Sequence, residues 1–415
     1  MKTKYIAHIT LESETPLKVG SAASDFVLDS PIQRDWNNLP MILGTSIAGV
    51  LRKDFGENED EIFGNEKGSN VVFSNALLVD ENNKVHEELL LDKSEFLSLF
   101  DALPVREHTA ITEKGVVKEH SKFDEEVVYK GSRFKFSIEI TEDEAAFKKL
   151  LSMLQSPSFR LGGGSTKGFG KFKVLSVADA IIETHEVWMD YSSSLNSLTS
   201  KEVTVANEKA YKHSRYALTL TPDDFFMFGS GFGDDDADQI PIVEKVIDYD
   251  KKRLSDNHII MPGSSLKGAI AHRTAYHYNL QNNLFIGNTE AKLVIDALFG
   301  EAKNSKKNTE GSKGKVLFSD VYKRDKNETK VFDHVSIDRF TGGGIDGALF
   351  QEKTTAQSDV WEIEVLLENG VEEVYVNAFE SALKDICSGM LPLGGMTTKG
   401  HGVFSGTVFK DGNEL

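Results

Sequence analysis

The sequence is poor in cysteine, in basic charge and in long apolar runs, and each shortage excludes a class of protein. Its single cysteine, Cys387, cannot form an intramolecular disulfide, and without a second thiol it offers no metal site. Lysine and arginine number 47 against 65 aspartate and glutamate residues, and the net charge of −18 argues against a protein that coats nucleic acid through bulk charge. The single cysteine fits a reducing cytoplasm, and no apolar run approaches the roughly 18 residues that a membrane span needs, so we expect a cytoplasmic protein that is neither secreted nor membrane-spanning.

The chain does contain an internal repeat, and its 415 residues are enough for two or three domains. The segments LGGGSTKGFGKF at 161–172 and LGGMTTKGHGVF at 393–404 are identical at eight of twelve positions. Three further matches follow the same order along the chain, at 40–49 with 260–268, at 62–75 with 298–320, and at 106–109 with 338–341. Matches that keep their order indicate a duplicated domain rather than a recurring loop.

Each half has the same predicted order of elements. Apolar and polar residues alternate, as they do in half-buried strands, at 5–12, 134–140, 216–221 and 361–365. Helices are expected after Gly44 and Gly263, and again before each Gly-rich segment. The fold class is therefore α+β, with two tandem ferredoxin-like (RRM-like) domains at 1–178 and 213–415, joined by a linker at 179–212.

The two Gly-rich segments are candidate phosphate-binding loops. Glycines let main-chain N–H groups approach an anion closely, and Thr-Lys recurs inside both segments. Neither segment is the phosphate loop of an NTPase, because a strand and not a helix follows the lysine, and neither is a dinucleotide fingerprint, because each precedes its strand. We therefore expect no nucleotide or organic cofactor. A tight turn with positive φ is the alternative for each loop, although such a turn has no use for a lysine.

These motifs resemble a known family. The helix entry Pro-Gly-Ser-Ser-Leu-Lys-Gly at 262–268, combined with a terminal Lys-Gly-X-Gly loop, resembles the RAMP superfamily of CRISPR systems. Within it, the segments 29–35 and 337–350 resemble the backbone subunit of type III effector complexes, here duplicated in tandem. The resemblance implies a thumb insertion in each domain, a groove that holds guide RNA by its backbone, and an aspartate that cuts the paired target RNA.

The resemblance assigns catalysis to two aspartates. Asp29 matches the cleavage residue, and Asp238, in the acidic loop 233–241, fits the corresponding pattern best. A carboxylate can act as a base toward a 2′-hydroxyl, or it can hold a divalent ion such as Mg²⁺ near the phosphate. Both residues also have a structural interpretation, because Asp-Ser-Pro is a good turn sequence and the acids at 234–236 suit a solvated run.

Basic residues and loop positions give the candidate RNA contacts. They are Gly163, Lys167, Gly168, Arg52, Gly263, Ser264, Ser265, Lys267, Arg273, Arg339, Gly395, Lys399 and Gly400. Each phosphate that is neutralised adds about one unit to the slope of log affinity against log salt concentration. Local clusters of basic residues are therefore enough for RNA binding, despite the net negative charge of the chain. In the thumb regions, His108 and His120 could stack on a base or act as an acid, and Phe340 and Phe350 could stack on bases.

We predict a guide-RNA-binding backbone subunit of a type III CRISPR ribonucleoprotein that cleaves complementary target RNA. It would be an RNA endonuclease dependent on a divalent ion, and its partners would be guide RNA, target RNA and other effector subunits. Two alternatives remain at this point. One is a scaffold that orders guide RNA without cutting, and the other is a guide-processing endonuclease that would use a histidine.

Overall fold

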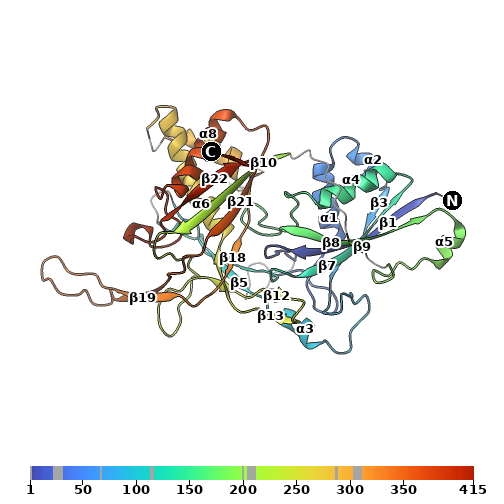
Figure 1. Cartoon of the computed structure of the whole chain (residues 1–415), viewed down its shortest axis with the longest axis horizontal. Coiled ribbons are helices and arrows are strands. Elements are labelled where there is room, and N and C mark those ends of the chain that lie inside the picture. Colours follow the sequence, from blue (N-terminus) through green and yellow to red (C-terminus); the bar gives the residue numbers. More distant parts are fainter. Residues whose placement is uncertain are drawn as a thin grey trace.

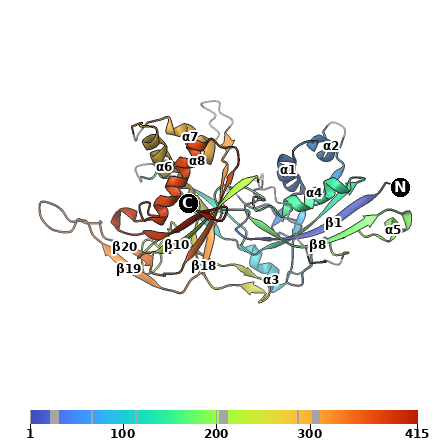
Figure 2. The same cartoon turned by 45° about the horizontal axis from the view of Figure 1, so that its top comes forward.

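The computed structural model describes residues 2–21, 31–65, 68–112, 116–198, 201–202, 212–285, 288–301 and 311–415. The chain forms two lobes along its longest axis, one near each terminus (Figure 1). Each lobe is an antiparallel sheet covered by helices, and the helices that cover the two sheets lie on the same side of the molecule (Figure 2). No helix in the described part is long and apolar enough to cross a membrane.

The first sheet has the ferredoxin-like order of elements. The core elements are β1 (Lys4–Ser13), α1 (Gly44–Phe55), β3 (Val71–Phe73), β7 (Arg133–Thr141), α4 (Glu144–Leu154) and β8 (Phe172–Ile182). The strands lie in the order β3-β7-β1-β8 with every pair antiparallel, which is the arrangement of a βαββαβ fold. Three short strands lengthen this sheet, namely β2 (Met41–Ile42), β4 (Ala76–Leu78) and β9 (Lys201–Glu202).

The second sheet repeats the arrangement. Its core elements are β10 (His213–Pro222), α6 (Gly263–Gln281), β17 (Val316–Phe318), β21 (Trp361–Glu368), α8 (Glu373–Cys387) and β22 (Phe404–Lys410). The strand order is β17-β21-β10-β22, followed by β23 (Asn413–Glu414). The α+β class and the ferredoxin-like order in both halves are thus confirmed.

Each domain has its own hydrophobic core because one face of each sheet and one stripe of each helix are apolar. In the first domain, Ile9 and Phe136 from the sheet and Leu150 from α4 are fully buried. In the second, Trp361 from β21 and Phe379 from α8 are fully buried. Helix α4 begins at an Asp143 cap, whose carboxylate accepts the Ala146 amide at 2.8 Å.

A thumb is inserted between the second and third core strands of each domain. The first thumb is the hairpin of β5 (Val105–His108) and β6 (Phe123–Glu126), and the second is the hairpin of β19 (Thr329–His334) and β20 (Phe350–Thr355). The first thumb lies against the second domain, whereas the second projects away from the molecule (Figure 1).

The strand pairing corrects one of the repeat matches. His108 pairs with Phe123 in the first thumb, and His334 pairs with Phe350 in the second. The counterpart of 105–108 is therefore 331–334, and the predicted match of 106–109 with 338–341 is wrong. That match relied on an arginine and a threonine in similar spacing, whereas the register of a hairpin is fixed by its strand pairs.

Part of the stretch predicted as a linker is a folded part of the first domain. Strand β8 continues to Ile182, and α5 (His185–Asp190) follows it. Farther on, Leu195 is buried in the first core, and Asn196 exchanges hydrogen bonds of 3.1 and 2.8 Å with the backbone of Val85. The polar, Ser-rich composition predicts a loose connection. In the structure, the buried Leu195 and the hydrogen-bonded Asn196 attach this stretch to the first domain.

The second domain also contributes to the core of the first. Strands β12 (Ile247–Asp248) and β13 (Arg253–Leu254) form a hairpin that lies near α3 (Glu95–Ser98) of the first domain (Figure 1). Tyr249 packs its ring 4.9 Å from Phe96 and donates its hydroxyl to the carbonyl of Val79 at 2.8 Å. The two domains are consequently fixed to each other by buried contacts.

The remaining short elements connect the core elements. They are α2 (Glu59–Phe63), η1 (Leu99–Asp101), β11 (Val243–Glu244), β14 (His258–Met261), α7 (Ala291–Phe299), β15 (Gly300–Glu301), β16 (Ser312–Lys313), β18 (Val321–Arg324) and η2 (Thr397–Lys399).

Candidate nucleic-acid interface

The two Gly-rich loops, 161–172 and 393–404, have the same backbone hydrogen bonds. Gly163 donates its amide to the Lys18 carbonyl at 2.7 Å, and Gly395 donates to the Met227 carbonyl at the same distance. A Cβ atom on the preceding residue, Gly162 or Gly394, would overlap the same carbonyl oxygen. Both positions therefore require glycine. The glycines are therefore explained in part by the conformation of the loop, which was the alternative considered for each.

The first Gly-rich loop lies at the junction between the domains. Gly168 accepts the Asp320 amide at 3.2 Å, and a Cβ atom on Gly263 would come within 2.7 Å of the Gly168 Cα atom. The Gly263 amide, at the start of α6, donates to the Asp320 carboxylate at 2.7 Å. Both glycines were predicted RNA contacts, but they are buried against each other, so we leave them out of the proposed RNA site.

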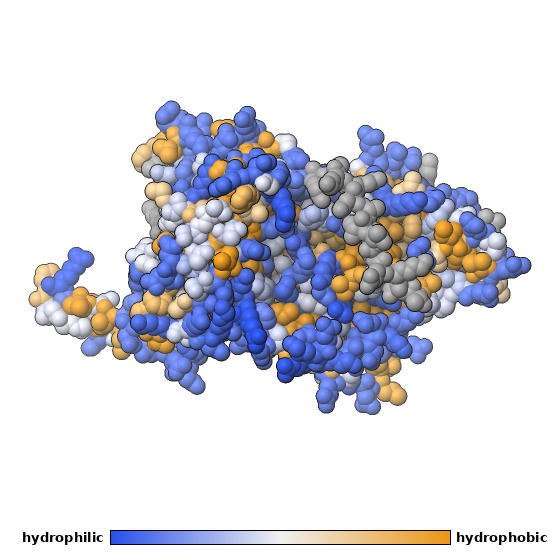
Figure 3. All heavy atoms as spheres, in the orientation of Figure 1, coloured by the Kyte–Doolittle hydropathy of each residue, from blue (hydrophilic) through white to orange (hydrophobic). Residues whose placement is uncertain are grey.

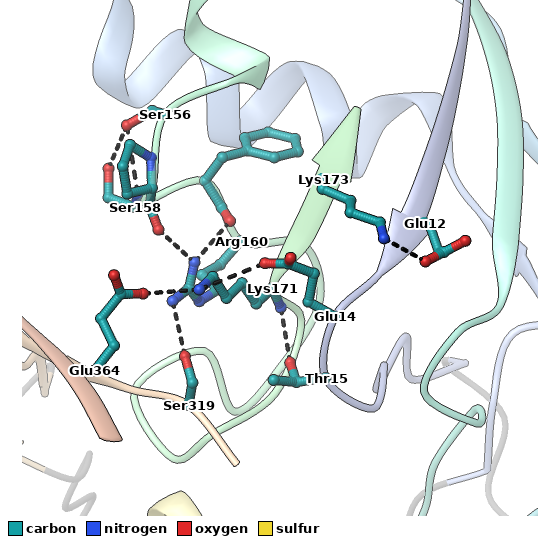
Figure 4. Close-up of polar contacts among 12 residues, drawn as sticks. Glu12, Glu14, Thr15, Ser156, Ser158, Arg160, Lys171, Lys173, Ser319 and Glu364 are labelled. Carbon is teal, nitrogen blue, oxygen red and sulfur yellow. Dashed lines mark hydrogen bonds and ion pairs between the residues drawn. The ribbon is translucent and has the colours of Figure 1, made fainter. Parts of the chain in front are cut away.

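A buried arginine supports the same junction (Figure 4). Arg160 donates to the Pro157 carbonyl at 2.7 Å and, across the junction, to the Ser319 hydroxyl at 3.1 Å. Burial lowers the pKa of Arg160 to about 10. Beside it, Lys171 forms an ion pair with Glu364 of the other domain at 2.7 Å. The first loop is thus held in place by contacts to both domains.

Two lysines meet across the junction, and among the residues that the structure describes neither has a carboxylate partner. Lys267 of α6 donates to the Thr166 hydroxyl in the first Gly-rich loop at 3.2 Å, and Lys167 is the next residue of that loop. Burial, and then the charge of Lys167, lower the pKa of Lys267 to about 8. In the ranges that the structure describes, no ion pair joins either lysine to an acid. Two like charges in a half-buried place favour binding of an anion.

A repeated cluster links each Gly-rich loop to its thumb. In the first domain, the Lys167 ammonium lies 5.3 Å from the Phe123 ring, which stacks on His108 at 5.1 Å. His108 lies 3.3 Å from Glu125. Burial raises the pKa of Glu125, but hydrogen bonds from His108 and Lys18 outweigh that effect and lower it to about 2.

The second domain has the corresponding cluster. Lys399 lies 4.4 Å from the Phe350 ring, which stacks on His334 at 4.8 Å, and His334 lies 3.3 Å from Glu352. Of the two predicted thumb residues in these clusters, His108 is held by Glu125, and Phe350 packs against His334. Sequence reasoning missed the clusters because their members come from separate segments; the recurrence of a histidine, a phenylalanine and a glutamate at nearly the same spacing, at 108, 123 and 125 and at 334, 350 and 352, would have identified them.

The three predicted arginines differ in their surroundings. Arg52 pairs with Glu59 and Asp60 and donates to the Gly64 carbonyl at 3.1 Å. Arg273 pairs with Asp385. Because their charges are already balanced within their domains, we leave both out of the proposed site. Arg339 is exposed in the second thumb.

The other predicted contacts lie at exposed or half-buried positions. Ser264 and Ser265 are in the first turn of α6, and Lys399 and Gly400 are exposed in the second Gly-rich loop. His120 is exposed near the tip of the first thumb, and Phe340 is fully exposed near the tip of the second.

The two predicted catalytic aspartates occupy equivalent positions in the repeat. Asp29 lies outside the described residues. The β-bridge Gly20–Ile32 in the first domain and the bridge Gly229–Pro241 in the second enclose the same number of residues, and this register aligns Asp29 with Asp238. Asp238 is exposed, and its carboxylate accepts the amide of Gln351 in the second thumb at 2.8 Å.

The acids beside Asp238 have structural partners. The Asp234 carboxylate accepts the amides of Asp236 and Ala237, each at 2.9 Å. Asp234 and Asp236 each form an ion pair with Lys353. Within the described ranges, no group of three His, Cys, Asp or Glu side chains could hold a metal ion. These side chains thus do not fit a metal site made by protein alone, and we assign no step to a metal.

The chain belongs to the RAMP superfamily, whose family model matches residues 10–173 and 200–405. A search of curated proteins finds no match. Among solved structures, a chain of the complex titled "Cryo-EM structure of the Type III-B Cmr-beta bound to cognate target RNA" is similar, with 20% identity and a TM-score of 0.33. The similarity covers 44% of this chain and 61% of that chain. The assignment to the superfamily depends on the family match alone.

Proposed function

We propose that this chain is a tandem backbone subunit of a type III CRISPR ribonucleoprotein and that it binds guide RNA across its domain junction. The observation that carries the proposal is the pair of Lys167 and Lys267. Lys267 has a lowered pKa because it is partly removed from water beside another cation. A bound phosphate would offset both effects, since it supplies a negative charge that the described residues do not place beside the two ammonium groups.

The second Gly-rich loop supports a continuation of the same path. Lys399 corresponds to Lys167 in the repeat, is exposed, and lies over an aromatic ring in the same manner. Two equivalent cations, one in each domain, suit a ligand with a repeating charge such as a sugar-phosphate chain.

The binding proposal is tested with a variant that removes both charges at the junction. Lys167→Gln with Lys267→Gln should weaken guide-RNA binding and lower the salt slope by up to about two units, one for each lost phosphate contact. Lys148→Gln is the matched control, because Lys148 is an exposed lysine of α4 that pairs with Glu144. Equal binding by the double variant and the control would refute the proposed site.

We further propose that Asp29 and Asp238 cut the target RNA that pairs with the guide. The support is their equivalent position in the repeat and the exposed carboxylate of Asp238. Each aspartate would act at one phosphodiester bond, so an intact chain would make two cuts.

Cleavage is tested in the reconstituted complex with Asp29→Ala, Asp238→Ala and the double variant. Asp235→Ala is the control, since it is an exposed acid of the same loop. Loss of one fragment for each single variant supports the proposal. Unchanged fragments in the double variant would favour a scaffold without catalysis, and cleavage of precursor repeat RNA by the isolated chain would favour a guide-processing enzyme.

A further inference from the structure

The loop that carries Asp238, residues 233–241, lies along β20 of the second thumb, whose tip projects from the body of the molecule (Figure 3). The Gln239 amide donates to the Gln351 carbonyl at 3.1 Å, and the Lys353 amide donates to the Gln239 carbonyl at 2.8 Å. Beside these bonds, the Asp238 carboxylate accepts the Gln351 amide at 2.8 Å. The position of Asp238 therefore depends on how firmly the loop is held against β20.

The loop has a concentration of negative charge that works against this contact. Four of the five residues at 234–238 are aspartates, whereas the aligned residues 25–29 of the first domain include two. Like charges at this spacing repel one another, and they also repel the phosphates of an RNA strand. A loop of this composition needs a nearby cation to stay in one place.

Lys353 supplies that cation. Its side chain extends from β20 to form ion pairs with Asp234 and, at 3.0 Å, with Asp236. The side chain of Lys353 is 17% exposed, and no other lysine or arginine among the described residues forms an ion pair with these two acids. Hydrogen bonding to Asp234 raises the pKa of Lys353 and lowers the pKa of Asp234, so both groups stay charged at neutral pH. A network of three charges holds a loop more firmly than an isolated exposed pair does.

The first domain holds the corresponding loop with the opposite charge. The hairpin registers align Glu126 with Lys353. Glu126 accepts the Ile32 amide at 2.9 Å and forms an ion pair with Arg34 at 3.1 Å. The bridge positions align Ile32 with Pro241, which has no N–H group to donate. An acid at position 353 would therefore lose its amide partner and would face the aspartates of the loop, whereas a lysine is attracted to them.

We propose that Lys353 is a positioning residue for the cut assigned to Asp238. It would touch no reacting atom and would act through Asp234 and Asp236, by balancing their charge and keeping the loop seated on β20. The first domain holds its loop through Glu126 instead, so the cut assigned there should not depend on Lys353. The inference rests on the proposed cleavage by Asp238.

Cleavage in the reconstituted complex tests this role, with Asp238→Ala identifying the fragment concerned. Lys353→Met should slow formation of that fragment about tenfold and leave the other fragment unchanged, because a displaced carboxylate no longer meets the scissile bond. Lys353→Arg should keep most of the activity, since a guanidinium can still reach two carboxylates. Lys326→Met is the matched control, because Lys326 is a lysine of the second domain that pairs with an aspartate outside the loop, Asp359. This control should leave both fragments unchanged.

A second variant separates positioning from direct contact with RNA. Lys353→Met combined with Asp234→Asn and Asp236→Asn removes the lysine together with the charges that it balances. Asparagine keeps a side-chain oxygen for the amides that Asp234 accepts within the loop. The triple variant should recover the fragment at close to the wild-type rate, which a misfolded chain could not do. No recovery would mean that Lys353 serves the RNA directly, and this result would overturn the proposal.

Hydrogen exchange gives a readout that does not depend on cleavage. In the isolated chain, Lys353→Met should speed exchange of the peptide 233–241 about tenfold, and the triple variant should restore the wild-type rate. The peptide 123–126 in the first thumb should exchange as in wild type. Wild-type exchange, or a wild-type rate for both fragments, in Lys353→Met would overturn the inference. Unchanged fragments in Asp238→Ala would instead refute the proposed cleavage, while the exchange rates would still decide whether Lys353 holds the loop.

Discussion

Lys267 makes the proposed RNA site sensitive to pH above about 8. Its pKa in the folded chain is about 8, compared with an ordinary value of 10.5. Phosphate stabilises the charged form, so RNA binding should return the pKa toward 10.5 and take up a proton. If the full shift is reversed, affinity should fall about tenfold between pH 7 and pH 9, which corresponds to about 1.4 kcal/mol.

The assay is fluorescence anisotropy of labelled guide RNA at constant ionic strength, at pH 7, 8 and 9. Lys267→Arg is the control, because a guanidinium remains charged throughout this range, and its affinity should change much less. Lys148→Gln should retain the wild-type pH dependence. A wild-type affinity that is constant from pH 7 to 9, or a tenfold loss that persists in Lys267→Arg, would refute the reasoning.

The same shift affects the stability of the RNA-free chain. The folded pKa is below the unfolded one, so between about 8 and 10.5 the unfolded chain binds more protons. The contribution of Lys267 to stability therefore increases as pH increases through this range, and it is lowest below pH 8. Denaturant titrations of wild type and Lys267→Gln should therefore show the free energy of unfolding of wild type increase, relative to that of the variant, as the pH increases.

The remaining predictions concern the catalytic aspartates and the junction. Asp29→Ala and Asp238→Ala should each abolish one target fragment while guide-RNA affinity stays unchanged, as measured by gel analysis of the reconstituted complex. Arg106→Ala should destabilise the chain by about 3–5 kcal/mol in urea titrations, because it leaves buried acids such as Asp320 unpaired, and a loss below 1 kcal/mol would contradict that role. Tyr249→Ala should cost about 3–5 kcal/mol by leaving a cavity beside Phe96, and full stability would show that the hairpin is not part of the first core.

The regular elements could be predicted from the sequence because their signals are local. Alternation of apolar and polar residues identified β1 and β7, and helical spacing identified α4. Thr141 and Glu144 have the spacing of a capping box, but Asp143 and not Thr141 caps the helix. Such errors at helix boundaries are small because several nearby polar residues can satisfy the same amides.

The site was harder to predict because it depends on contacts between distant segments. A glycine such as Gly168 has the same sequence signature whether a phosphate or another glycine approaches it, and only the junction with Gly263 separates the two cases. The ion pairs of Arg52 and Arg273 could also not be predicted, because only the folded structure shows which acids lie beside these arginines. The lysines of the Gly-rich loops were found because their recurrence in both repeats is visible in the sequence itself.

The nucleic acid that accompanies the purified protein tests the central claim most directly. We expect extraction and sequencing to yield one class of short RNA with a common repeat-derived end, and we expect its amount to fall sharply when Lys167, Lys267 and Lys399 are all changed to glutamine. Protein that purifies from its native host without RNA, or with RNA that the triple variant retains in full, would contradict the account.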